Sequence, residues 1–203
     1  MKGSANLVIA AFDIGFKNFA VAIEGVVNLT PECEGYEDES GNKLECELRR
    51  DIILADTTDI TQFSTKSELR SKSYFMGAIE YMDSISEYMD MCDVILIEQQ
   101  LQRNCKAVKL QQNLHTYLMT KYRRDKKIII YPSTNKTRAF DAPKMTKPQR
   151  KKWAVDKALD ILQSMNSMFF DKIAQMKKRD DVCDCVLMIE SYKMKSHKMN
   201  PVG

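Results

Sequence analysis

The stretch LVIAAFDIGFKN, residues 7–18, decides the fold of this chain. Six apolar residues run without interruption up to Asp13, and a glycine and a lysine follow within four residues. An unbroken apolar run of this length predicts a strand buried on both faces. A carboxylate at the end of such a strand is a common way to build a metal or phosphate site. Asp and Gly also favour turns, so ordinary turn chemistry stays open at this point.

The rest of the chain continues with alternating strand and helix patterns. Apolar runs predict strands over 7–13, 19–25, 48–56, 93–98 and 126–132. Helical spacing predicts helices over 64–90 and 105–123, one capped by Thr146 and one that begins near Arg179. The segment 133–148 is expected to be a polar loop. This order predicts one α/β domain, residues 1–203, built on a mixed sheet with helices packed against it.

Composition limits the possible functions. The chain has 203 residues, of which 44% are hydrophobic and 29% charged, as in an ordinary globular domain. No apolar run is long enough to span a bilayer, and the N-terminus does not read as a secretory signal, so we expect an intracellular protein. Six cysteines form no CxxC pair and only two histidines occur, which disfavours a zinc finger or a Ser-His-Asp site.

The charge of the chain is unevenly distributed. Residues 99–152 contain fifteen lysines and arginines against two acids, a net charge of +13, whereas the net charge of the whole chain is only +3. The remainder therefore carries −10, and part of it is an acidic, turn-rich segment over 28–47 that we expect to be an insertion. Residues 193–203 are expected to be a flexible basic tail. Clustered Lys and Arg are rewarded by counterion release from nucleic acid, so we expect a nucleic-acid partner.

Four acids stand where they could converge. Asp13 and Glu98 each close an apolar strand, and Asp181 and Asp184 lie three residues apart on the predicted last helix, hence on one face. Like charges held together near apolar surface are unfavourable unless a cation neutralises them. Four carboxylates with almost no histidine favour Mg²⁺ or Mn²⁺, and two such ions are used in phosphodiester hydrolysis.

Three short motifs, AFDIGFKN, VILIEQQ.QR and DDVCD, resemble the Holliday junction resolvases of poxviruses and related large DNA viruses. That family is akin to the RuvC-type and fungal mitochondrial resolvases. The resemblance implies a ribonuclease H-like fold with a mixed five-stranded sheet flanked by helices. It also implies a homodimer, two Mg²⁺ ions (with Mn²⁺ as a substitute) in each active site, and nicking of four-way DNA junctions.

The resemblance to these resolvases assigns roles only to residues of this chain that match the family's motifs. Asp13, Glu98, Asp181 and Asp184 match the acids that hold the metal ions, and Asp180 ranks below Asp181. The family also places a lysine on the penultimate helix, for which Lys147, Lys151 and Lys152 are candidates and Lys151 is preferred. We expect DNA contacts from the residues that follow: Lys17, Gln100, Arg103, Lys121, Arg123, Arg124, Lys136, Lys147 and Lys152.

The sequence therefore predicts a structure-selective, Mg²⁺-dependent endonuclease that resolves four-way and other branched DNA junctions by paired symmetric nicks. In a poxvirus-like virus it would act in the host cytoplasm, at the viral factory. Two alternatives stay open: a ribonuclease H acting on RNA–DNA hybrids, and a DNA-binding module without catalysis. A sugar-kinase or actin-type ATPase also opens with a DxGxxN-like turn, but only Gly203 follows Gly77, too few glycines for later phosphate loops.

Overall fold

The computed structural model describes residues 7–28, 48–71 and 74–199. Five strands form one sheet in the order β3-β2-β1-β4-β5. The strands are β1 (Ile9–Asp13), β2 (Phe19–Asn28), β3 (Leu48–Thr58), β4 (Val94–Glu98) and β5 (Lys127–Tyr131). β1, β2 and β3 are antiparallel neighbours, whereas β4 and β5 pair in parallel with β1 and β4. The predicted mixed five-stranded sheet is confirmed.

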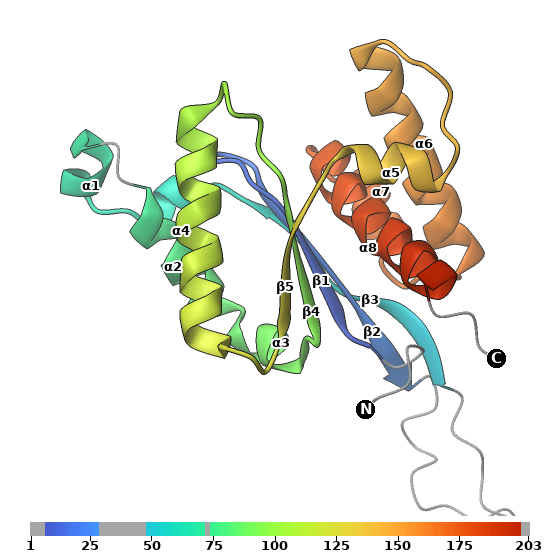
Figure 1. The fold of residues 1–203 in the computed structure, drawn as a ribbon, viewed down its shortest axis with the longest axis horizontal. Coiled ribbons are helices and arrows are strands. Elements are labelled where there is room, and N and C mark those ends of the chain that lie inside the picture. The colour runs from blue at the N-terminus through green and yellow to red at the C-terminus, as the bar shows by residue number, and fades with distance from the viewer. Residues whose placement is uncertain (1–6, 29–47, 72–73, 200–203) are drawn as a thin grey trace, which may run out of the picture.

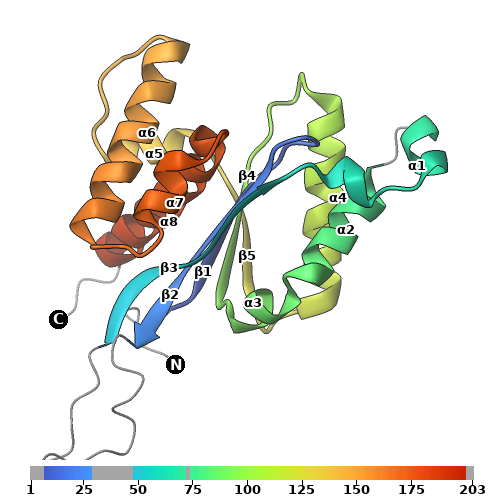
Figure 2. The same ribbon diagram turned by 180° about the vertical axis from the view of Figure 1, so that it is seen from behind.

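Helices cover both faces of the sheet (Figures 1 and 2). One layer contains η3 (Ile60–Phe63), α1 (Lys66–Ser71), α2 (Phe75–Ser84), α3 (Ser86–Met91) and α4 (Cys105–Tyr122). The other contains α5 (Thr134–Ala139), α6 (Lys147–Ser164), α7 (Phe170–Gln175) and α8 (Arg179–Met199). None of the described helices is long and apolar enough to cross a membrane.

The central strand β1 is buried on both faces, as its unbroken apolar sequence predicts. Ile9 and Ala11 pack with α6 and α8, whereas Ala10 and Phe12 pack with α2 and α4. The face under α8 is lined by small, fully buried alanines, including Ala22. Small side chains let a helix approach the sheet closely, and this closeness brings the acids at the start of α8 near the ends of the strands.

The turn after β1 explains the glycine at position 15. A Cβ atom there would lie 2.7 Å from the carbonyl oxygen of Asn18, closer than real Cβ contacts. The tight connection from β1 to β2 therefore needs Gly15 for its own closure.

Two sequence-based boundaries are wrong. The single helix predicted over 64–90 is three shorter helices, α1 to α3, and Met76 of its apolar stripe is 41% exposed. The predicted polar loop 133–148 contains α5, whose six residues TNKTRA show no apolar periodicity. By contrast, α6 begins after Thr146 as predicted, with the Thr146 N–H donating to the Gln149 side chain at 2.9 Å.

Two predicted segments lie at or beyond the limits of the description. The acidic insertion over 28–47 falls outside the described residues, apart from the last residue of β2. The helix α8 continues to Met199, so residues 193–199 of the predicted flexible tail are helical.

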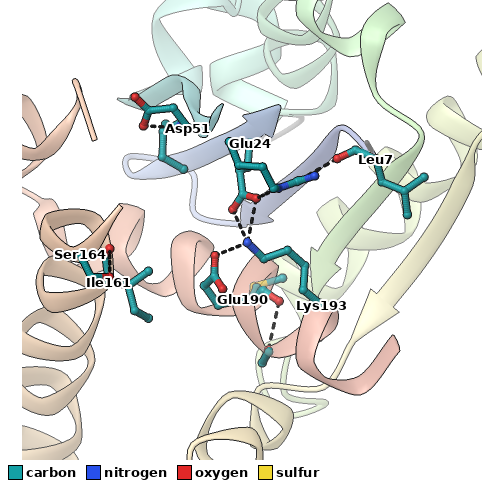
Figure 3. Close-up of polar contacts among 11 residues, drawn as sticks. Leu7, Glu24, Asp51, Ile161, Ser164, Glu190 and Lys193 are labelled. Atoms are coloured by element: carbon teal, nitrogen blue, oxygen red, sulfur yellow. Dashed lines mark hydrogen bonds and ion pairs between the residues drawn. The ribbon is translucent and has the colours of Figure 1, made fainter. Parts of the chain in front are cut away.

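A buried ionic network ties the sheet to α8 at the end of β1 away from Asp13 (Figure 3). Glu24 is 1% exposed and accepts from Arg50 Nε at 2.5 Å and from Lys193 Nζ at 2.8 Å. Lys193 also pairs with Glu190, one turn earlier on α8. Because β2, β3 and α8 each contribute a charge, the network fixes the position of α8 on the sheet.

Candidate active site

Two acids lie at the same edge of the sheet, where β1 and β4 end. The parallel register places Phe12 opposite Ile97, so Asp13 and Glu98, the next residues, come out side by side. Their carboxyl groups are close enough that each shifts the pKa of the other. The sequence analysis expects these two acids to converge, and the parallel pairing of β1 with β4 brings them together.

The side chain of Lys136 lies among the acids. It comes from α5, is 6% exposed, and its Nζ atom lies 2.9 Å from Glu98 Oε1 and 3.0 Å from Asp184 Oδ1. The sequence analysis names Lys136 as a DNA contact, which stays a prediction; in the structure its ammonium is buried against two carboxylates. Its position depends on α5, the helix that sequence analysis missed.

The electrostatics of this cluster are unbalanced. Burial, repulsion from Glu98 and the hydrogen bond to Glu98 raise the pKa of Asp13 well above its usual range. Burial alone would also raise the pKa of Glu98, but Lys136 and the hydrogen bond from Asp13 lower it. Burial raises the pKa of Asp184, partly offset by Lys136. One ammonium therefore faces three carboxyl groups, which leaves negative charge that a further cation could neutralise.

The two aspartates of α8 do not occupy equivalent positions. Asp184 faces Lys136, whereas Asp181 is half-buried and its pKa is raised by burial and by its neighbour Asp180. Asp180 forms an ion pair with Lys151 of α6, with 2.7 Å between Oδ2 and Nζ. Lys151, the preferred catalytic lysine from the sequence, is thus tied to the acid that sequence reasoning had ranked lower.

A cavity of about 420 Å³ opens beside the acids. Glu98, Lys136 and Asp184 line one end, and one face of α6 lines another side with Lys147, Arg150 and Lys151. These three side chains recur at positions i, i+3 and i+4 of the helix, so they share a face. The site therefore combines acids at one end with a row of cations along which a polyanion could lie.

Several predicted DNA contacts lie at the same edge as this cavity. Lys17 is exposed in the turn after Asp13, and Arg103 is exposed in the segment after β4. Gln100 lines the cavity together with Lys147. Lys152 lies on another side of α6, where it borders a smaller outer hollow with Gln149 and Asp156.

Three other predicted contacts lie at the opposite end of α4. This helix begins beside the acids and ends at Tyr122, near the start of β5 (Figure 1). Lys121 in its last turn pairs with Asp83 at 3.0 Å, and Arg123 and Arg124 follow it as exposed residues. The basic segment 99–152 is therefore divided by the fold into a part at the site and a part remote from it.

The described residues contain no group of three or more acid, histidine or cysteine side chains arranged to hold a metal ion. In the acid cluster, the Lys136 ammonium pairs with two of the carboxylates. The donor set nevertheless has the right chemistry, since carboxylate oxygens are the ligands that Mg²⁺ prefers. The four-acid metal site stays a prediction.

Comparison with known proteins finds similar proteins in two viruses. This chain is 33% identical over 207 residues to uncharacterized protein 97L of Invertebrate iridescent virus 3, an alignment that spans 92% of this chain and 99% of that protein. The chain belongs to the 97L family. Uncharacterized protein 170L of Invertebrate iridescent virus 6 is 25% identical to this chain, in an alignment that spans 93% of this chain. No protein-family model matches the sequence.

Solved structures share the fold of this 97L-family protein. The Fowlpox virus resolvase, crystallised with Holliday junction DNA, matches with a TM-score of 0.57 and 21% identity, covering 94% of this chain and 98% of that one. The yeast mitochondrial Holliday junction resolvase Ydc2 matches with a TM-score of 0.61 and 13% identity, covering 96% and 84%. Thermus thermophilus RuvC in complex with its junction substrate matches with a TM-score of 0.55 and 11% identity, covering 95% of this chain and 96% of that one. The chain therefore has the ribonuclease H-like fold of RuvC-type resolvases, as expected.

Proposed function

We propose that this protein is a structure-selective endonuclease that resolves four-way DNA junctions by paired symmetric nicks. One observation carries the proposal: the carboxyl groups of Asp13, Glu98 and Asp184 gather around Lys136 at one end of a cavity whose side is a row of cations. The likeness of the whole fold to three junction resolvases supports the choice of substrate. Ribonuclease H chemistry on RNA–DNA hybrids is the second candidate, because the same acids would serve it.

The acids are the groups that would hold metal ions. Asp13, Glu98 and Asp184 offer carboxylate oxygens, with Asp181 a fourth on the same helix as Asp184, and the single ammonium of Lys136 pairs with two of these acids. Two Mg²⁺ ions, or Mn²⁺ in their place, would supply charge neutralisation at the scissile phosphate and activation of water. The residues fit such ions by donor chemistry.

The protein's own cations have distinct roles in this proposal. Lys136 is held by Glu98 and Asp184, so its ammonium is positioned to neutralise charge as the phosphodiester is cleaved. Lys147 and Arg150 on α6 would bind the phosphates that flank the scissile one. Lys151 would contact the backbone from its ion pair with Asp180, next to these two residues.

A homodimer with two-fold symmetry would account for paired nicks, since a four-way junction is itself two-fold symmetric. The two relatives come from invertebrate iridescent viruses. We therefore also propose that the protein acts inside infected host cells, in the cytoplasm where viral DNA is processed.

Cleavage of synthetic substrates tests the proposed function. With Mg²⁺, we expect two symmetric nicks in a four-way junction and far slower cleavage of an RNA–DNA hybrid or of linear duplex. Asp13→Asn should abolish nicking and keep junction binding. The matched control, Asp156→Asn on the outer side of α6, removes one charge elsewhere and should cut normally. Preferred cleavage of the hybrid, or undiminished nicking by Asp13→Asn, would refute the assignment.

A further inference from the structure

The turn after α4 holds an arginine where glycine is the usual residue. Arg123 has φ 51° and ψ −116°, and the Asp125 N–H donates to the Tyr122 carbonyl at 2.9 Å. These features describe a type II′ turn over residues 122–125, with Arg123 at its first central position. Glycine is preferred there, because a residue with a Cβ atom is strained at positive φ. Arg123 therefore keeps a backbone conformation that its own side chain makes unfavourable.

The two arginines of this turn are exposed and unpaired in the described part of the chain. Arg123 and the next residue, Arg124, are both exposed, and neither guanidinium has an ion-pair partner among the described residues. Strained residues persist where the surrounding structure fixes them, and they concentrate at functional sites. A strained arginine whose charge is not used in this part of the fold indicates a binding role.

The turn is attached to a rigid support formed by the ends of α3 and α4 (Figure 1). The Tyr122 hydroxyl donates to Asp90 Oδ1 at 3.0 Å. The Nζ atom of Lys126 donates to the carbonyl oxygens of Asp90 and Cys92, at 2.7 Å each, and lies 4.8 Å from the centre of the Tyr122 ring. These contacts fix the residues on either side of the two arginines relative to α3.

Exposed apolar side chains lie beside the turn. Met119, whose carbonyl accepts from the Arg123 N–H, is 45% exposed, and Met91, which follows Asp90 in the support, is 49% exposed. Tyr88, one helical turn before Met91, is 37% exposed. Methionine is flexible and polarisable, and it is common at surfaces that bind other proteins. The region therefore offers unpaired cations next to adaptable apolar contacts.

We propose that this region binds a partner protein through a segment in which one or two acidic residues flank large apolar side chains. The α4-end surface, as we name it, consists of Tyr88, Met91, Met119, Arg123 and Arg124. The planar guanidinium groups form paired hydrogen bonds with carboxylates of the segment. Its apolar side chains cover the two methionines and the tyrosine.

The surroundings of the arginines favour a protein over a nucleic acid. A nucleic-acid backbone has no apolar groups to cover Met91 and Met119. Exposed acids also adjoin the arginines, namely Asp90 and Asp125, and they repel phosphates, which recur all along a strand. A peptide can place its few acids opposite the arginines alone.

The α4-end surface is remote from the candidate active site. The helix α4 begins beside the acids, and its 18 residues span about 27 Å. A partner can therefore bind at the far end of α4 while DNA occupies the site. The inference goes beyond the proposed function and does not depend on it.

Peptide selection followed by substitution tests the inference. Short random peptides displayed on phage are selected on the full-length protein, and the selected peptides are synthesised with a fluorescent label. We expect them to combine acidic and large apolar residues. Fluorescence anisotropy should show an affinity loss of about 10-fold or more in Arg124→Gln, because a hydrogen bond to a charged group is lost. Lys106→Gln, at an exposed position at the other end of α4, is the control and should bind as wild type does.

Arg123→Gly separates binding from folding. Relief of the strained turn should raise Tm by about 2–4 °C, while peptide affinity falls about 10-fold or more. Selected peptides without acids, or affinity changed less than about twofold in both arginine variants, would overturn the inference. So would a lower Tm in Arg123→Gly. A change of mass in sedimentation, or an equal loss of junction affinity, in the arginine variants would assign the surface to a second copy of this chain or to DNA instead.

Discussion

The Nζ atom of Lys136 lies 3.0 Å from Oδ1 of Asp184, an ion pair that joins α5 to α8 at the edge of the sheet where β1 and β4 end. The same ammonium is 2.9 Å from Glu98. Burial would lower the pKa of Lys136, but attraction to Asp184 and Glu98 raises it, so this lysine stays charged. A buried charge with fixed partners is a structural element of the site as well as a chemical group in it.

Lys136→Met should destabilise the protein most when divalent ions are absent. The substitution leaves Asp13, Glu98 and Asp184 without their cation, and removing one partner of a buried ion pair costs about 3 kcal/mol of unfolding free energy. Divalent ions should restore more stability to the variant than to wild type, because they would replace the lost charge. Urea unfolding in excess EDTA and in excess magnesium chloride measures both effects.

The exposed Lys106, at the start of α4, supplies the control, and Lys106→Met should change unfolding by less than about 0.5 kcal/mol. Nicking should fall about 100-fold or more in Lys136→Met, as for other groups that stabilise charge in a transition state. Equal stabilisation of wild type and variant by magnesium would contradict the expected replacement. A larger loss of nicking in Lys151→Met than in Lys136→Met would indicate that Lys151, the lysine preferred from the sequence, is the catalytic one.

Much of this site could be predicted from sequence because the acids follow strong patterns. Asp13 and Glu98 end apolar runs, and such runs have few alternatives to buried strands. Once both strands are parallel neighbours, their carboxyl ends coincide. The pair Asp181 and Asp184 follows from helical spacing alone, although spacing could not tell that only Asp184 would face Lys136.

Lys136 could not be found in the same way. The helix that carries it has six residues, all polar except its last alanine, so no periodicity marks it. In a segment with fifteen basic residues, a lysine destined for burial has no local signature. The distance of Arg123 and Arg124 from the site could not be predicted either. Charge composition gives the number of cations in a segment, but it does not show that a long helix separates these two arginines from the acids.

Junction affinity should depend on the cations of α6 far more than on those at the far end of α4. Lys147→Gln with Arg150→Gln removes two charges from the cavity wall. Each lost phosphate contact makes the negative slope of log affinity against log salt shallower by about 0.9. The slope of the double variant should therefore be shallower than that of wild type by about 2. Fluorescence anisotropy with a labelled junction at several salt concentrations measures it.

Arg123→Gln with Arg124→Gln is the matched comparison, since it removes the same charge from exposed positions remote from the site. Its salt slope should remain close to that of wild type. A similar loss in both double variants would mean that DNA also follows the far end of α4, as the charge pattern in the sequence originally indicated.

Asp51 should contribute strongly to stability and little to catalysis. It is fully buried on β3 and accepts hydrogen bonds from the Ser167 hydroxyl and, at 3.0 Å, from the Met168 N–H, which fixes the connection between α6 and α7. Asp51→Ala leaves these donors buried without a partner, which should lower the unfolding free energy by about 3 kcal/mol. Urea unfolding checks this value, with Asp156→Ala as the exposed control. Retained stability would mean that the loop repacks around the smaller side chain.

Glu190 should make stability fall as pH rises from about 5 to 7. Burial raises its pKa from 4.5 to about 7, despite the nearby Lys193. The folded state therefore keeps a proton that the unfolded chain releases above about 4.5. Stability from this proton is lost as pH rises toward 7, with a slope of at most about 1.4 kcal/mol per pH unit. Above that range both states are ionised and this slope ends.

The neutral variant Glu190→Gln removes that slope, so its unfolding free energy relative to wild type should increase between pH 5 and 7 and then level off. Other titrating groups, Asp13 among them, contribute equally to both proteins and cancel in the difference. Urea unfolding at pH 5, 6, 7 and 8 measures it, with Glu87→Gln at an exposed position of α3 as the control. Parallel curves for wild type and Glu190→Gln would show that Lys193 holds Glu190 ionised throughout, as an ion pair shared with Glu24 would require.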